Sequence, residues 1–539
     1  MKSGFWIGFS YWVVSALFCW PAPWMDPQVL PTRHFDLYPV LWLIQEAPSI
    51  LPLLFHPTSA WPYGESLVRI DSYLLLGIGW LNHGWLSPLQ VVDLLMWGGP
   101  ALNAMAAEVC AHRAFGVPRP YSWIAGLSYG FSGIAAVALL EGHVYHLLNP
   151  WMPLLLGALW VGTGPQGRWY HGFLGGLAWA LCQFTSAYLG IGAFLVAVGL
   201  WLRAPRLHLL PGLALGALPP AAYYLWLFSM GGTWKDNAPP AGALQTGVAT
   251  LGTLLGASPL IDLGGHSIAA PLAFLSFWLW ALAPWVLKKP WKGLWLMGLL
   301  SLLFSFGAYF RAVPGGEGMA SPLAWLALWF PSLSFFRFPI RFLWVFSLIS
   351  GVMASRVMAE RWRGGFWWGG LALVDVFWTT GMPGRLSWGI AEVPSAYASA
   401  PPERAVLDLF GEALDPSSGE LEMRSRVLGC YYQSFHHRPI TEVCIGTSVQ
   451  SPREELSRWL MQHTDDQDLL KKLGEAGIGA VVLHLDTLRP ADARVLAQAL
   501  QAAGPPVETS DGGEHLQLFA LPRVETESFK AGMQRIRAQ

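Results

Sequence analysis

Long apolar runs separated by short turns fill residues 1–383 of the chain. A helix of about 20 residues crosses the hydrocarbon core of a bilayer, and a shorter apolar run fits where it is tilted or packed in a bundle. We therefore predict eleven membrane-spanning helices, near residues 5–20, 88–111, 120–139, 150–164, 171–186, 188–203, 207–229, 268–287, 293–310, 339–356 and 364–381.

The pattern changes after residue 383, where strand-like and helix-like segments alternate. Segments 405–410, 426–435, 478–486 and 515–522 are typical of strands, and segments 452–462 and 491–504 are typical of helices. The predicted fold is mainly α: a polytopic transmembrane helix bundle over residues 1–383, followed by a small α/β domain over residues 384–539.

Composition agrees with this division. Of the 67 charged residues, 36 lie in the last 156 residues, which are about 23% charged, whereas the first 383 residues are about 8% charged. Tryptophan is distributed in the opposite way, because 29 of the 31 precede residue 384. An average soluble protein is about 25% charged, so only the C-terminal segment has the composition of a soluble domain.

Lysine and arginine mark every second turn between the predicted spans. Cytoplasmic loops of membrane proteins carry an excess of these residues, so we predict a cytoplasmic N-terminus and an integral plasma (inner) membrane protein. Eleven spans then leave the C-terminal domain on the extracytoplasmic, or periplasmic, side. No small-x-small cleavage site follows the first span, which we expect to be retained. The basic residues are Lys2, Arg113, Arg119, Arg168, Arg203, Arg206, Lys288, Lys289, Lys292, Arg356, Arg361 and Arg363.

Several functional classes are disfavoured by what the sequence lacks. A net charge of −1 and the absence of a Lys/Arg-rich run argue against nucleic acid as a partner. The five cysteines contain no CxxC pair, which argues against a zinc ribbon or a thioredoxin-like site. Neither a Walker A sequence nor a GxGxxG after a strand is present, which argues against chemistry driven by a soluble nucleotide.

Most polar residues of the membrane segment that do not mark basic turns lie on the predicted outer side. Charged groups near membrane depth are costly unless they line a wet cavity, so this grouping predicts a polar site on the outer face. The alternative is that outer loops are polar simply because water solvates them. The group includes Arg69 and Asp71 in the first outer segment, residues 21–87, and Tyr188 in the turn between the fifth and sixth spans.

The first outer segment contains two short apolar stretches, residues 37–47 and 74–86, which we predict to be helices lying along the membrane interface. Asp36 comes directly before the first of them. Its carboxylate is suited to cap the N-terminus of that helix, and equally to act as a base aimed into a cavity at the membrane surface.

A second polar group, Glu141, His143 and His146, lies where the third span leaves the bilayer. On a helix the two histidines would share a face, which allows a metal pair, but no third ligand stands at a diagnostic spacing. We favour contacts to a phosphate or a sugar hydroxyl, or simple anchoring at the interface.

Two arginines, Arg337 and Arg341, stand four residues apart at the outer end of a later span. They can clamp a phosphate or anchor the helix among lipid headgroups, and the residues alone favour neither interpretation. The sequence GLSYG at 126–130 matches the GxSxG nucleophile pattern but lies inside a predicted membrane helix, so we interpret it as packing by small residues.

The C-terminal domain shows no nucleophile–base pair and no metal-ligand pattern. Cys430 and Cys444 can form a disulfide in an oxidising compartment, but the sequence leaves their pairing open. His436 and His437 form its only dense polar spot, which we interpret as surface. A binding or lid role suits this domain better than catalysis.

Five stretches in order along the chain carry a family resemblance. They are HFDLYPVLW around Asp36, WPYGESLVRIDS, EGHVYHLLNPWMPLL, TSAYLG and FFRFPIRFLWVFS, followed by a tail containing AVLDLF, YYQSFHHRPI and GIGAVVLHLD. In this order they resemble the bacterial GT-C-type polytopic membrane glycosyltransferases, especially the YfhO-like group. The resemblance covers nearly the whole chain, and the order of the motifs is more specific than any single motif.

The resemblance implies an enzyme that takes a sugar from a polyprenyl-phosphate donor in the membrane lipids and passes it to a glycan, lipid or protein acceptor outside the cytoplasm. Asp36 would be the general base that deprotonates the acceptor hydroxyl. Arg337 and Arg341 would hold the carrier phosphate, and Glu141 and His143 would orient sugar or acceptor. We place His146, Arg69, Asp71 and Tyr188 with the substrate-binding and donor-binding residues.

The sequence departs from the family in one respect. Many members carry paired acidic residues in the first outer loop, whereas the neighbours of Asp36 are Phe35 and Leu37. This departure argues against a metal-dependent mechanism, so we assign no metal ligand and no cofactor, and leave a divalent cation open.

Two other functions remain as alternatives. A transporter or lipid flippase would use ionisable residues at mid-membrane, for which Asp93, Glu108 and Asp375 are scattered candidates, but no internal repeat supports it. A non-catalytic envelope assembly subunit would keep the fold and use its outer domain to bind partners.

Overall fold

The structure is a computed structural model. It describes residues 2–20, 25–26, 29–31, 36–50, 55–56, 65–66, 72–229, 273–307, 309–311, 318–329, 339–362, 364–382, 389–390, 393–401, 404–410, 428–433, 436–441, 444, 452–509 and 515–522.

The chain divides into two compact units. The first comprises residues 1–25, 71–75 and 92–388, and the second comprises residues 26–70, 76–91 and 389–539. The chain passes from the first unit to the second for the last time after residue 388, close to the predicted domain boundary after residue 383. Most of the predicted first outer segment, in contrast, belongs to the same unit as the C-terminal residues rather than to the helical unit.

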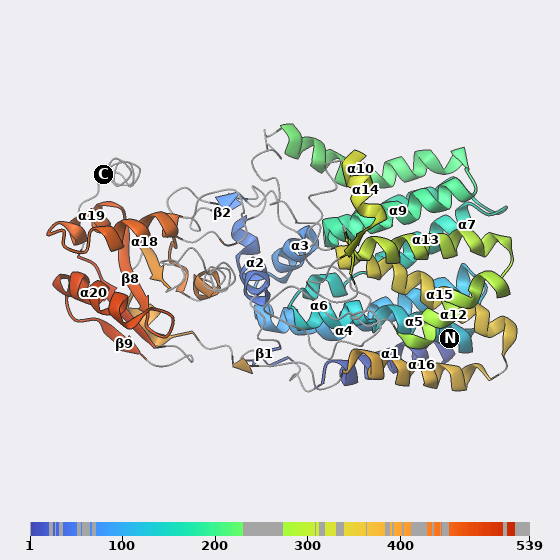
Figure 1. The fold of residues 1–539 in the computed structure, drawn as a ribbon, viewed down its shortest axis with the longest axis horizontal. Coiled ribbons are helices and arrows are strands. Elements are labelled where there is room, and N and C mark those ends of the chain that lie inside the picture. The colour runs from blue at the N-terminus through green and yellow to red at the C-terminus, as the bar shows by residue number, and fades with distance from the viewer. Residues whose placement is uncertain are drawn as a thin grey trace. The chain divides into compact units, whose positions relative to one another are not determined.

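The first unit is a bundle of apolar helices that lie alongside one another (Figure 1). A helix lies at least in part within each of the eleven predicted spans. Helix α14 and the two-stranded hairpin β4–β5, which the structure also describes in this unit, were not predicted. The elements are α1 (Lys2–Phe18), α4 (Pro88–Arg113, from Val92 onward in this unit), α5 (Arg119–Gly130), α6 (Gly133–Leu140), η1 (Val144–Leu147), α7 (Trp151–Gly162), α8 (Trp169–Thr185), α9 (Ala187–Arg203), η2 (Leu207–Leu209), α10 (Leu210–Ser229), α12 (Phe274–Val286), α13 (Lys289–Ser305), β4 (Tyr309–Arg311), β5 (Gly318–Ala320), α14 (Pro322–Trp329), η6 (Pro339–Phe342), α15 (Leu343–Arg361) and α16 (Gly365–Thr380).

Among the described residues, two continuous helical segments are both long and apolar enough to cross a membrane, Arg119–Leu140 and Pro339–Arg361. Other apolar helices are shorter. The 13 residues of α12, for example, extend about 20 Å, against about 30 Å for a hydrocarbon core. The number of eleven crossings therefore stays a prediction.

Small residues allow the helices of this unit to approach closely. Gly172 and Gly176 on α8 lie against the backbone of Leu209 and Leu213, where no side chain has room. This small-xxx-small spacing is the one that membrane helices use for packing. Gly130 of the GLSYG sequence likewise lies against the backbone of α4, so its interpretation as a packing motif is confirmed.

The second unit contains two short helices from the first outer segment, α2 (Leu37–Ile50) and α3 (Tyr73–Asn82, from Leu76 onward in this unit). They match the two predicted short helices, and Gly79 of α3 lies directly against Ile44 and Ala47 of α2. The short strands β2 (Phe55–His56) and β3 (Glu65–Ser66) pair antiparallel, as do β1 (Val29–Leu30) and β6 (Gly389–Ile390).

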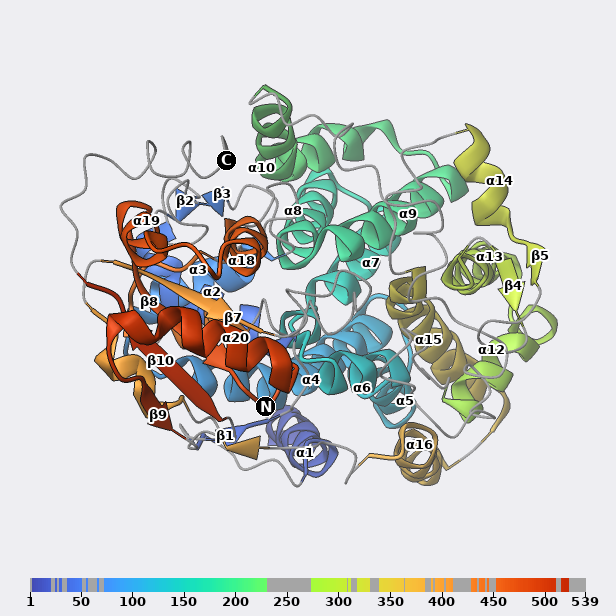
Figure 2. The ribbon, with the colours of Figure 1, turned by 60° about the vertical axis from the view of Figure 1, so that its left-hand side comes forward.

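A four-stranded sheet of order β7-β8-β10-β9 forms the centre of the C-terminal residues (Figure 2). Strand β7 (Ala405–Leu409) is parallel to β8 (Ile478–His484), and β10 (Leu516–Ala520) is antiparallel to both β8 and β9 (Val507–Thr509). Apolar side chains of α18 (Pro452–Gln462), α19 (Leu469–Glu475) and α20 (Pro490–Leu500) pack with those of the sheet into one core. The described residues of this unit also include two short 3-10 helices, η7 (Ser395–Ser399) and η9 (Gln501–Ala503).

One predicted strand is wrong. Residues 428–433, within the segment 426–435, are helical, and the side chains of this turn are almost all buried. A short segment that is buried on every side shows no alternation of apolar and polar residues, so its pattern does not distinguish a helix from a strand. Its apolar and aromatic residues therefore led to the wrong prediction of a strand. The other predicted strands and helices of this domain are confirmed, while α19 and β9 were missed.

Candidate functional site

Asp36 stands one residue before α2, in the second unit, and is partly buried. The helix that it precedes places Leu37, Leu41 and Ile44 in the protein interior, which fixes the orientation of its first turns. The position is therefore the start of a packed helix, and the two roles predicted for the carboxylate, cap and base, stay predictions.

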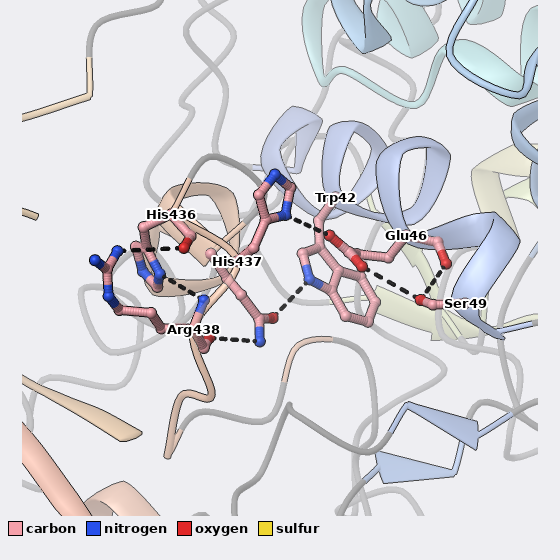
Figure 3. A network of polar contacts seen from close by, with 7 residues as sticks. Trp42, Glu46, Ser49, His436, His437 and Arg438 are labelled. Atoms are coloured by element: carbon pink, nitrogen blue, oxygen red, sulfur yellow. Dashed lines mark hydrogen bonds and ion pairs between the residues drawn. The ribbon is translucent and has the colours of Figure 1, made fainter. Parts of the chain in front are cut away.

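Helix α2 is tied to the C-terminal residues by a polar network (Figure 3). The indole Nε1 of Trp42 donates to Oε1 of Gln433 over 2.9 Å, and Nε2 of Gln433 donates to the carbonyl of Arg438 over 3.1 Å. Both side chains are buried. At the surface, Nδ1 of His437 lies 3.7 Å from Oε1 of Glu46. The segment around residue 433 thus holds the helix that follows Asp36.

A disulfide closes this segment. Cys430 and Cys444 are bonded, with their Cα atoms 5.6 Å apart, which answers the question that the sequence left open. Next to Cys430, the ring of Tyr431 lies 4.9 Å from the ring of Tyr38, in the first turn of α2. The cross-link therefore lies beside the contact between the C-terminal residues and the start of α2.

The two adjacent histidines differ in environment. His437 is exposed, as predicted, whereas His436 is partly buried and stacks on the ring of Tyr397 at 5.2 Å, so its assignment to the surface is wrong. Nδ1 of His436 accepts a hydrogen bond from the backbone N–H of Arg438. Burial lowers the pKa of His436 to about 4, because a charged ring would lose its hydration there.

A buried polar cluster in this unit was missed. The Tyr397 hydroxyl donates to Oδ1 of Asp408 over 2.5 Å, and Nε2 of His484 lies 3.3 Å from both oxygens. All three side chains are buried, so the cluster joins β7 and β8 internally and is closed to a substrate. The available signal was one polar side chain in each of two otherwise apolar strands, Asp408 within β7 and His484 at the end of β8.

In the first unit, the structure brings Glu141, His143 and His146 together. Glu141 ends α6, and its Oε2 lies 3.2 Å from Nδ1 of His143. The ring of His146, which is buried, lies 5.4 Å from that of His143. The group does not lie on one α-helix as the spacing argument supposed, because Gly142, with a φ of 72°, turns the chain into the 3-10 helix η1.

Buried hydrogen bonds hold this turn in place. The amide of Asn103 on α4 donates to the carbonyl of Leu147 over 2.6 Å, and its Oδ1 accepts from the backbone N–H of Asn149. The hydroxyl of Tyr129 on α5 donates to the carbonyl of Asn149 over 2.8 Å. Sequence reasoning missed Asn103 and Tyr129, because nothing in an apolar helix shows which polar residue reaches a distant loop.

The structure also brings together Tyr188 and Arg341. Arg341 lies in η6 and is only 8% exposed, and its guanidinium lies over the ring of Tyr188 on α9 at 4.2 Å. The planar guanidinium stacks well on an aromatic face. Of the other predicted residues, Arg69, Asp71 and Arg337 lie outside the described residues.

Three solved structures are similar to this chain. The structure of the arabinofuranosyltransferase AftD from Mycobacteria aligns over 97% of this chain and 40% of its own length, with a TM-score of 0.57 and 14% identity. This is the GT-C fold. The oligosaccharyltransferase from Archaeoglobus fulgidus aligns over 92% of this chain and 71% of its own length, with a TM-score of 0.47 and 12% identity. ArnT from Cupriavidus metallidurans, bound to undecaprenyl phosphate, aligns over 97% of this chain and 99% of its own length, with a TM-score of 0.49 and 11% identity.

The likeness lies in the fold rather than in the sequence. No protein-family model and no curated protein matches the chain. This chain spans about two fifths of the length of AftD, the first structure named. The GT-C resemblance expected from the motifs is therefore confirmed as a fold, while its narrower YfhO-like assignment stays a prediction.

Within this GT-C fold the described candidates form two groups in the first unit, Glu141 with His143 and His146, and Tyr188 with Arg341, while Asp36 belongs to the second unit. No three His, Cys, Asp or Glu side chains lie together as a metal site in the part of the chain that the structure describes. The chemistry that these groups offer is a carboxylate base and a stacked, desolvated cation.

Proposed function

We propose that this chain is an integral membrane glycosyltransferase that moves a sugar from a polyprenyl-phosphate donor to an extracytoplasmic acceptor, a cell-envelope glycan, lipid or protein. The GT-C fold supports the general kind of reaction. The observation that carries the proposal is the place of Asp36 directly before α2, in the first segment after α1, where the resemblance requires a base.

In the proposed mechanism the Asp36 carboxylate accepts the proton of an acceptor hydroxyl. The oxygen attacks the anomeric carbon as the bond from that carbon to the phosphate oxygen breaks, and polyprenyl phosphate leaves with the bonding electrons. One displacement inverts the anomeric configuration. A general base of this kind typically contributes a factor of about 10² to 10⁴ in rate.

The leaving phosphate gains negative charge as the bond breaks, and Arg341 is suited to stabilise it. Its guanidinium is nearly buried, so it interacts with a phosphate more strongly than an exposed arginine would. By the family resemblance we assign the carrier phosphate to Arg337 as well, and orientation of the sugar or acceptor to Glu141 and His143.

Insertion in the membrane, with the N-terminus in the cytoplasm, is part of the proposal. The alternating basic turns support the orientation. Large apolar side chains on many helices of the first unit are exposed, as expected of surfaces that face lipid. They include Trp6, Phe9, Leu94, Leu154, Leu174, Phe194, Trp278, Trp285, Leu296, Trp367 and Trp378.

The experiment is a transfer assay with the full chain reconstituted in lipid nanodiscs. A panel of labelled polyprenyl-phosphate sugars is supplied with envelope extract as acceptor, and release of polyprenyl phosphate is measured with label transfer. The proposal expects one donor to be consumed stoichiometrically with transfer. Absence of consumption with every donor, together with stable co-purification of other envelope proteins, would favour the assembly-subunit alternative.

The transporter alternative gains no support. The carboxylate of Asp375 accepts from the backbone N–H groups of Phe274 and Leu275 at the start of α12, and Glu108 accepts from the hydroxyl of Ser122. Such roles hold helix ends and helix contacts in place, which is a different task from relaying ions.

A further inference from the structure

Helices α4, α7 and α8 of the first unit line a cavity of about 420 Å³. Its walls are almost entirely apolar, and three of the wall side chains, Val109, Leu154 and Leu174, are between 47% and 48% exposed. A cavity bordered by exposed apolar side chains opens outward as a groove. In a bilayer such a groove faces lipid.

The two ends of the groove differ. Arg113, the last residue of α4, and His171, in the first turn of α8, line one end, where His171 lies against Gly162 at the end of α7. Trp151, the first residue of α7, lines the other. The ten helical steps from Trp151 to Val161 extend about 15 Å along α7. This length is half the thickness of the hydrocarbon core, which is the depth of one leaflet.

The polar end has the features of a headgroup site. Nδ1 of His171 lies 3.0 Å from the backbone nitrogen of Arg168, which fixes the ring at the start of α8. Arg113 is exposed, and the adjacent Trp169 and Tyr170 are exposed aromatic residues of the kind found at membrane interfaces. Arg113 and Arg168 both belong to turns that the sequence predicts to be cytoplasmic.

We propose that this groove binds an anionic phospholipid of the cytoplasmic leaflet. One acyl chain would lie along α7 between α4 and α8, with the phosphate between Arg113 and His171. Basic pockets between membrane helices on the cytoplasmic side are known to hold anionic headgroups, and the charge of this end complements them. The site is separate from the proposed donor site, which is predicted on the outer side, and requires membrane insertion but no transferase activity.

Native mass spectrometry of the full chain tests the proposal. The protein is released from nanodiscs that contain equal amounts of phosphatidylglycerol and phosphatidylethanolamine with identical acyl chains. We expect one phosphatidylglycerol to be retained in preference. Arg113→Gln should weaken that retention about fivefold, the effect of one basic residue near an anionic headgroup. The matched control Arg361→Gln, at an exposed helix end away from the groove, should leave it unchanged.

A second variant tests the apolar part of the groove. Ala158→Trp, in the wall, should block retention by filling the space of the acyl chain, whereas Leu300→Trp, an exposed apolar position on α13, should not. Equal retention of both lipids, or retention that neither Arg113→Gln nor Ala158→Trp lowers, would overturn the proposal. Preferential retention of added polyprenyl phosphate over phosphatidylglycerol would overturn it as well, by assigning the groove to the carrier.

Discussion

Arg341 shows how the chain holds a cation in a poorly hydrated place. Its guanidinium is 8% exposed and rests on the ring of Tyr188, which supplies an attractive face without neutralising the charge. The stacking on Tyr188 favours one orientation of the guanidinium plane. A lysine in this position would keep the charge but lose the planar stack and the paired donors.

From this geometry we predict that Arg341→Lys lowers kcat/KM for the lipid-linked donor by about tenfold to a hundredfold, the usual effect of losing a charge-assisted hydrogen bond. Tyr188→Phe keeps the ring face and should stay within about twofold of the unchanged protein, while Tyr188→Leu should resemble Arg341→Lys. Initial transfer rates measured over a range of donor concentrations check this. Full activity in Arg341→Lys would remove Arg341 from the donor site.

A second prediction concerns His436. The pKa of its folded form is about 4, below the unfolded value near 6.5, so the unfolded chain binds a proton first as the pH falls. The contribution to stability is present above pH 6.5 and is lost between 6.5 and about 4, by about 3 kcal/mol in all. His436→Gln should flatten this part of the pH dependence of thermal unfolding, whereas His515→Gln, at an exposed position, should not. Identical pH profiles for the unchanged protein and His436→Gln would contradict the assignment.

At the scale of elements, the decisive contact is the one that ties α2 to the disulfide-closed segment around residue 433. Gln433 uses its two amide atoms at once, accepting from Trp42 and donating to the Arg438 carbonyl, and the Trp42 and Gln433 side chains are buried. A buried polar group that loses its partner costs about 1–3 kcal/mol, so this one side chain fixes α2 firmly. Because Asp36 directly precedes α2, the C-terminal residues help to position the proposed base.

We therefore predict that Gln433→Leu lowers kcat for sugar transfer by about tenfold or more with a smaller change in the KM for donor, because the shift of α2 misplaces the base rather than the donor site. The exposed pair of Gln517 and Glu508 offers the control, and Gln517→Leu should leave both constants unchanged. Equal membrane abundance of the variants shows that folding is retained. An unchanged kcat in Gln433→Leu would separate α2 from catalysis.

The elements themselves followed largely from the sequence, because apolar runs and alternating patterns reflect burial directly. The pattern failed at residues 428–433, where every side of a short helix is buried. The contacts that hold the sites could not be predicted. Asn103 reaches Leu147, and Asp408 meets His484, only because distant elements pack together, and neither pairing leaves a periodic signal.

At the scale of the whole molecule, the GT-C fold and the division into two compact units change the place of the C-terminal residues. The composition suggested a membrane domain with an accessory soluble domain. The structure places most of the first outer segment, with Asp36 and α2, in the same compact unit as the C-terminal sheet. The proposed base therefore belongs to the unit that the composition had marked as accessory.

The most direct measurement is the initial rate of sugar transfer by reconstituted Asp36→Asn, compared with Asp26→Asn in the same segment and unit. Asparagine keeps the size of the side chain and its ability to cap a helix but is no base at neutral pH. The account predicts a loss of about 10² to 10⁴ in kcat for Asp36→Asn at unchanged membrane abundance, and an almost unchanged rate for Asp26→Asn. Transfer by Asp36→Asn at the rate of the unaltered protein would contradict the central claim that Asp36 is the base.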